Sequence, residues 1–134
     1  MFINRFGVYR WSEYVFEDNS TRDKYWISLT CKIDQKEYHA ILPTSKVEKH
    51  KFNTIDAYII EAGKSQYFKS STLLDFKKIK INKKEDINSA FKDDKFSYLG
   101  LLEESIQNDI KDLITNAETL SQNLINTLLC EKKY

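Results

Sequence analysis

The spacing of the apolar residues changes once along the chain, near residue 99, and no other feature limits the possible folds as much. Before this point apolar and polar residues alternate, most clearly in 25–33, YWISLTCKI. After it, apolar residues recur at steps of three and four, at positions 102, 106, 110, 113, 117, 120, 124 and 128. Alternation is typical of a half-buried strand, and steps of three and four are typical of an amphipathic helix. The sequence therefore predicts an α+β chain with strands first and helices last.

The strand-like part of the chain extends over about 80 residues. Residues 24–42 are predicted to form a β-hairpin with its turn at 34–36, and the alternation puts Tyr25 and Ile27 on one face and Trp26 on the other. Further strands are expected in three segments: 8–16, 54–60 and 70–82. Five or six short strands at such spacings are typical of a small antiparallel barrel.

The last third of the chain has no glycine or proline between 101 and 130, which favours helix. The segment 115–118, TNAE, matches a capping box that would restart a second helix, so one long helix and a helical hairpin are both compatible with the sequence. A short helix is also expected near 84–91. At 134 residues the chain is expected to form one domain, with a barrel core in 1–95 and a helical region in 97–130.

The charges nearly cancel, because 21 Lys and Arg face 20 Asp and Glu. A protein that is basic overall is therefore excluded, and any contact with nucleic acid must use a local patch. Cys31 and Cys130 lie far apart in apolar surroundings and are interpreted as buried thiols in a reducing compartment. The start of the chain does not continue into an apolar run, and no stretch is long enough to span a membrane, so a soluble cytoplasmic protein without membrane contact is expected.

Few chemistries fit this composition. The two histidines, His39 and His50, are not near a cysteine or a carboxylate cluster at metal-ligand spacing, and three glycines do not make a phosphate-binding loop. We expect neither a metal nor a cofactor. Any catalysis would then depend on cations, hydroxyl groups and one carboxylate.

The stretch 38–46, YHAILPTSK, leads an apolar strand into the only proline of the chain, which two hydroxyl residues and a lysine follow. An ordinary turn at a strand end explains Pro, Thr and Ser. The alternative is an anion site, because hydroxyl groups and lysines together donate hydrogen bonds to phosphate oxygens. The sequence leaves both interpretations open.

Five segments occur in an order that resembles a known family: Gly7 before the first aromatic strand, FEDNSTRDKYWISL (16–29), YHAILPTSK (38–46), STLLDFKKI (71–79) and YLGLLEESI (98–106). Over most of the first 115 residues this layout resembles the MazF/PemK-like toxin superfamily, including its ToxN-like branch. The resemblance implies a small SH3-like barrel with helices. It also implies a metal-independent endoribonuclease that cuts single-stranded RNA, is neutralised by a cognate protein or RNA antitoxin, and forms homodimers.

The resemblance also implies which residues act on RNA. Lys24 matches the basic catalytic residue of the family, Thr44 its threonine with Ser45 beside it, and Asp75 the aspartate of a later strand. Lys24 and Tyr25 stand where the family most often has Arg-Pro. Such a site would leave a 2′,3′-cyclic phosphate, with Asp75 or His39 as candidates for the general base.

Four further residues are expected to bind the RNA strand. Arg22 is the candidate to replace the missing family arginine, and Lys46 follows the two hydroxyl residues. Trp11 and Trp26 are candidates for stacking on bases in a single-strand groove. An alternative function from another class is a non-catalytic SH3-like module that holds RNA or a peptide, or that assembles through its C-terminal helix.

The apolar positions of the tail continue past the length needed to cover a small barrel, with Ile125 and Leu129 beside them. A soluble monomer rarely exposes so large an apolar patch. A second copy, an antitoxin segment or a helical hairpin within the same chain would cover it, and an isologous dimer is the default for the first case.

Overall fold

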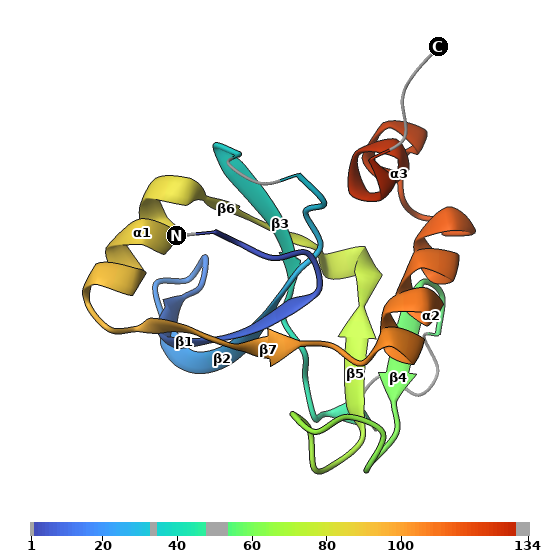
Figure 1. Cartoon of the computed structure of the whole chain (residues 1–134), viewed down its shortest axis with the longest axis horizontal. Helices are drawn as coiled ribbons and strands as arrows, with labels where there is room; N and C mark the ends of the chain where they lie inside the picture. The colour runs from blue at the N-terminus through green and yellow to red at the C-terminus, as the bar shows by residue number, and fades with distance from the viewer. Residues whose placement is uncertain (1, 33–34, 48–53, 131–134) are drawn as a thin grey trace.

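The computed structural model describes residues 2–32, 35–47 and 54–130, and within them the chain is α+β (Figure 1). The first residue of the predicted turn at 34–36 lies outside these residues, and so does His50. The strands are β1 (Gly7–Val15), β2 (Thr21–Ser28), β3 (Glu37–Ile41), β4 (Ala57–Ile60), β5 (Thr72–Asp75), β6 (Lys80–Lys83) and β7 (Phe96–Leu101). The helices are α1 (Lys84–Lys92), α2 (Glu104–Thr115) and α3 (Gln122–Leu129), with a 3-10 turn at Phe76–Lys78.

The strands form two antiparallel sheets. Five strands lie in the order β6-β3-β2-β1-β7, and β4 and β5 form a separate pair. The predicted hairpin of β2 and β3 is confirmed by the pairs Ile27 with Ile41 and Ser28 with Ala40. As far as the described residues extend, the larger sheet is open, with β6 and β7 at its edges, so a closed barrel is not seen.

The last part of β2, residues 26–28, is buried on both faces, although its alternation predicted a half-buried strand. Neighbouring residues Trp26 and Ile27 are both 0% exposed. Ile27 belongs to a core that also contains Ile110 of α2 and Leu128 of α3, whereas Trp26 belongs to an aromatic core beside α1. Figure 1 shows α1 on one side of the sheet and α2 with α3 on the other. The prediction of a solvated face was wrong because helices from later in the chain cover both faces.

Residues 96–101 form β7, which pairs antiparallel with β1, so the helical region does not begin at 97 as expected. Three apolar side chains of this edge strand are exposed: Tyr98, Leu99 and Leu101. Helix α2 begins only at Glu104, after the buried Leu102, from which the helical spacing continues. The short helix expected near 84–91 is present as α1.

The tail is a pair of helices rather than one. Helix α2 ends at Thr115, and α3 is capped by Ser121, whose hydroxyl accepts a hydrogen bond from the backbone N–H of Leu124. The second helix therefore begins later in the chain than the capping box expected at 115–118. Ile125 and Leu128 are buried in the same core as Ile110. The hairpin thus covers within the chain the apolar surface that suggested a second copy.

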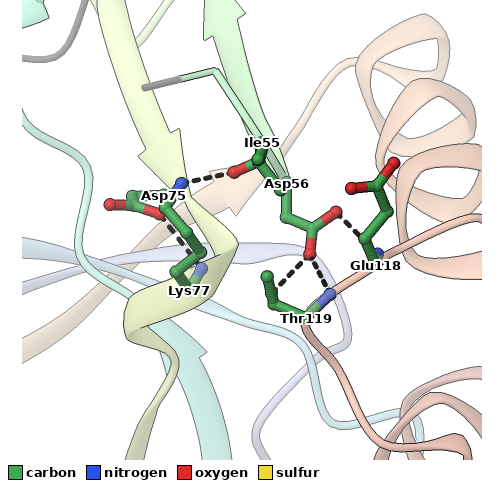
Figure 2. Close-up of polar contacts among 6 residues, drawn as sticks. All are labelled: Ile55, Asp56, Asp75, Lys77, Glu118 and Thr119. Carbon is green, nitrogen blue, oxygen red and sulfur yellow. Dashed lines mark hydrogen bonds and ion pairs between the residues drawn. The ribbon is translucent and has the colours of Figure 1, made fainter. Parts of the chain in front are cut away.

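The loop between α2 and α3 is held by one carboxylate, that of Asp56 before β4 (Figure 2). Asp56 accepts hydrogen bonds from the backbone N–H groups of Glu118 (3.0 Å) and Thr119 (2.7 Å) and from the hydroxyl of Thr119. Partial burial raises the pKa of Asp56, but these hydrogen bonds lower it more, so that its pKa lies below the ordinary value. The charged form therefore stabilises the packing of the two helices.

We expect Asp56→Asn to lower the free energy of unfolding at pH 7 by about 1 kcal/mol, less than a hydrogen bond to a buried charge contributes, because solvent reaches this loop. Asn tolerates the left-handed backbone of Asp56 (φ 50°), so the variant leaves the backbone unstrained and removes the charge together with one of the two acceptor oxygens. Because the folded pKa is depressed, this stability is present above the unfolded pKa of about 3.9 and is lost as the pH falls through the folded pKa. Urea unfolding should show a smaller gap between the two proteins near pH 3 than at pH 7, and a gap that stays constant contradicts the assignment.

Cys31 and Cys130 are joined in a disulfide, with their Cα atoms 6.1 Å apart and a separation of 99 positions in sequence. The interpretation of the two cysteines as separate buried thiols was therefore wrong. Their distance in sequence gave no sign of the contact, because the α2–α3 hairpin returns the end of α3 to the segment after β2. None of the described helices is long and apolar enough to cross a membrane.

Candidate functional site

A cavity of about 400 Å³ lies where β2 begins and the segment after β3 leaves the sheet. Antiparallel pairing of β2 with β3 brings the start of β2 and the end of β3 to the same end of the sheet. The cavity, hereafter the first cavity, is lined by Asp23, Lys24, Tyr25, Pro43, Thr44, Ser45, Lys46, Tyr67, Phe68, Lys69, Ser70 and Thr72. Four residues expected at the site, Lys24, Thr44, Ser45 and Lys46, are among them.

Thr44 is fixed by its backbone. Its N–H donates to the carbonyl of Leu73 (3.1 Å), and the N–H of Leu73 donates to the Thr44 carbonyl (2.8 Å), so that the segment after β3 is linked to β5. The Thr44 hydroxyl oxygen accepts a hydrogen bond from the backbone N–H of Lys46 (3.2 Å). Because the hydroxyl hydrogen is not used in that bond, Thr44 can still donate to a ligand in the cavity.

Lys24 is half-buried in β2, where it pairs with Trp11 of β1. Burial lowers the pKa of Lys24, and the neighbouring cations Arg22 and Lys46 lower this pKa further. Among the described residues no carboxylate forms an ion pair with Lys24. A half-buried ammonium group without a counter-ion is stabilised by an anion that enters the cavity.

A second cavity of about 290 Å³ shares two lining residues, Lys24 and Thr44, with the first. Its other lining residues are Phe16, Leu42, Asp75, Lys78 and Lys80. We refer to the two cavities together as the cleft. Asp75 therefore lies in the cleft, but on the side away from Ser45 and Lys46.

The carboxylate of Asp75 has partners within the chain (Figure 2). It accepts a hydrogen bond from the backbone N–H of Lys77 (3.0 Å) and forms an ion pair with the Lys77 ammonium (2.9 Å), which also donates to the carbonyl of Ile55. Asp75 thereby caps the 3-10 turn that follows β5. These contacts give Asp75 a structural role whether or not it also acts on a substrate.

The cleft is positively charged in a protein that is nearly neutral overall. Among the described residues, five lysines line it: Lys24, Lys46, Lys69, Lys78 and Lys80. The two carboxylates described in its lining are each bound to another cation, Asp23 to Arg10 (3.3 Å) and Asp75 to Lys77 (2.9 Å). Such a cluster of cations with hydroxyl groups favours a ligand with more than one phosphate.

Two of the expected RNA-binding residues are core residues. Trp26 is 0% exposed and donates its indole N–H to the side-chain oxygen of Asn82 (2.9 Å), and Trp11 is 8% exposed among aromatic neighbours. Neither ring is open to a base, so the expectation that the tryptophans stack on RNA was wrong. Arg22 lines neither cavity; its guanidinium lies over the ring of Phe16, 5.6 Å from the centroid.

Other residues of the cleft were missed from the sequence. Tyr25 is 38% exposed and lines the first cavity, with its ring edge-on to Phe68 at 5.4 Å between centroids. Tyr25 and Ile27 lie on the same face of β2, which predicted that the side chain of Tyr25 is buried in the core. Tyr25 does lie on this face, but at the point where the core ends and the first cavity begins. His39, a candidate general base, lines neither cavity, and burial lowers its pKa.

No protein-family model and no curated protein matches this chain. What the cleft can bind and do therefore follows from its own side chains. In the part of the chain that the structure describes, these are an ammonium group without a carboxylate partner, two hydroxyl groups at a strand end, four further lysines and one exposed aromatic ring.

Proposed function

We propose that this protein is an endoribonuclease that binds single-stranded RNA along the cleft and cleaves it without a metal ion. The observation that carries the proposal is the meeting of Lys24, Thr44 and Ser45 around one positively charged cavity. A ligand that needs only charge neutralisation requires lysines but no fixed hydroxyl groups. Hydroxyl groups and a half-buried ammonium together suit a phosphorus centre whose negative charge increases during reaction.

The proposed reaction is a transesterification. The 2′-oxygen of RNA attacks the adjacent phosphorus, the bond from phosphorus to the 5′-oxygen breaks, and the products are a 2′,3′-cyclic phosphate and a 5′-hydroxyl. Lys24 and Thr44 donate hydrogen bonds to the non-bridging oxygens, and the lowered pKa of Lys24 favours proton transfer to the departing 5′-oxygen. Asp75 shares the second cavity with Lys24 and Thr44, which makes it our candidate to accept the 2′-hydroxyl proton.

Further parts of the proposal follow the family resemblance. The two sheets, joined by the bridge between Thr44 and Leu73, would correspond to a partly open SH3-like barrel. The nuclease would act as the toxin of a toxin–antitoxin system, held by a protein or RNA antitoxin. A homodimer would have to use a surface other than Ile125 and Leu128, which are buried within the chain.

One observation favours the second candidate, a non-catalytic module that binds RNA in the same cleft. Both carboxylates that the structure describes in the cleft already have cation partners, so either of them must give up an ion pair before it acts as a general base. A binding module needs no base, and the lysines alone would hold a phosphate backbone.

The deciding experiment is incubation of the full chain with end-labelled single-stranded RNA in excess EDTA. We expect fragments that carry 2′,3′-cyclic phosphate ends, while an oligonucleotide with 2′-deoxyribose throughout binds but stays intact because it lacks the attacking oxygen. RNA that binds with a salt-dependent affinity and is never cut would overturn the nuclease and support the binding module.

A further inference from the structure

We infer that the two cavities of the cleft bind different parts of a single-stranded RNA. In the first cavity an unpaired base stacks on Tyr25, and in the second, on the other side of Lys24, a phosphate lies against Lys78 and Lys80. This inference rests on the proposed function and specifies its substrate. The RNA must present an unstacked, unpaired base beside the phosphate at Lys24. A duplex cannot do so, because its bases are paired inside the helix.

The first cavity has the aromatic surface that a base requires. Tyr25 is 38% exposed and lines it, and the ring of Phe68, itself only 6% exposed, meets Tyr25 edge-on. Tyr67 extends the aromatic surface, with its ring 6.3 Å from Phe68 and its hydroxyl bonded to the carbonyl of Leu101 (2.9 Å). Rings held in this way lose little freedom when a base stacks on the exposed one.

The second cavity offers charge in place of an open ring. Lys78 and Lys80 line it, and neither forms an ion pair with a described carboxylate. Its one aromatic residue, Phe16, is half-buried and has the guanidinium of Arg22 over its ring. Because Lys24 and Thr44 line both cavities, a strand bound there passes from the aromatic side to the cationic side.

The base arm of the test uses the wild-type chain and a single-stranded RNA whose scissile position carries 2′-deoxyribose, so that binding is measured without cleavage. An abasic site is moved along this strand one position at a time. We expect one position at which the loss of the base weakens binding by about 5- to 150-fold, the range for stacking of a base on an aromatic ring. Equal affinity at every position overturns the inference.

Two variants of Tyr25 separate stacking from folding. Tyr25→Phe keeps the ring and should bind the intact strand like the wild type, whereas Tyr25→Leu should bind it more weakly by the factor found in the abasic scan. With the strand that is abasic at the sensitive position, all three proteins should bind alike. A Tyr25→Leu variant that binds the intact strand as tightly as wild type overturns the role of this ring.

The phosphate arm uses salt dependence. Replacing Lys78 and Lys80 by Ala should reduce the slope of log K against log salt concentration by about 0.7 for each phosphate of the single strand that these lysines neutralise. Lys92→Ala, on the exposed end of α1, is the matched control and should leave the slope unchanged. An unchanged slope in the double variant overturns the phosphate site.

The outcomes also separate this inference from the proposed function. RNA that is cleaved, but with no dependence on the base or on Tyr25, refutes the inference and leaves the nuclease in place. A wild-type chain that neither binds nor cleaves RNA refutes both.

Discussion

Thr44→Ala and Lys24→Ala are each expected to lower the rate of RNA cleavage by about 10²–10³-fold, the usual cost of removing one donor to a developing oxyanion. Thr44→Ser keeps a hydroxyl on the same fixed backbone and should retain most of the activity. Lys24→Arg keeps the charge and should lose less than Lys24→Ala. The measurement is single-turnover cleavage of labelled RNA in EDTA, which separates chemistry from binding and product release.

The pH dependence of the same rate tests the role of Lys24. Burial lowers its pKa, so the ammonium loses its proton, and with it the ability to stabilise charge, at a lower pH than an ordinary lysine. The rate should therefore fall as the pH rises through that lowered pKa. In Lys24→Arg this decline should move to higher pH, because arginine stays charged.

Lys92→Ala serves as the control for these variants, and each should unfold at the same urea concentration as the wild type. Thr44 is held by backbone hydrogen bonds to Leu73, which the alanine variant retains. Alanine variants that cleave RNA at the wild-type rate would remove Lys24 and Thr44 from the chemistry.

The sequence predicted those elements whose pattern is local. The aromatic, β-prone composition of 8–16 located β1, alternation located the β2–β3 hairpin, and steps of three and four located the buried face of α2. Strand β7 was missed because its exposed Tyr98, Leu99 and Leu101 do not alternate with polar residues, and its strand conformation depends on pairing with β1. Burial on both faces at the end of β2 was missed for a similar reason, since the aromatic core on one face is completed by α1 and β7.

The residues of the cleft also fall into those that a local pattern predicted and those that it did not. Lys24 and Thr44 lie together because the hairpin, which the sequence did predict, fixes the relative position of its strand ends. Lys69, Lys78 and Lys80 flank β5 or lie in β6, and no pattern in their own segments shows that the chain returns them to the hairpin. The tryptophans were assigned to RNA because a large aromatic ring suits a base as well as a core, and only burial separates the two.

Trp26→Ala is expected to lower the free energy of unfolding by about 3–5 kcal/mol, the cost of removing a buried aromatic side chain from a core. Its ring is 0% exposed and packs edge-on against Tyr9 (5.6 Å between centroids) and Phe96 (5.4 Å). Its indole N–H also bonds to Asn82, whose oxygen would lose that partner. Urea unfolding followed by circular dichroism measures the loss.

Tyr25→Ala, one residue earlier in β2, is the matched comparison. Because Tyr25 is 38% exposed and its main ring contact is Phe68, the loss in stability should be about 1 kcal/mol or less. The two variants should therefore have opposite signatures: Trp26→Ala unfolds at much lower urea but binds RNA normally while folded, and Tyr25→Ala stays stable but binds RNA weakly. A Trp26→Ala protein that is stable but binds RNA weakly would show that Trp26 contacts RNA directly, because a core ring can change RNA binding only by changing the stability of the fold.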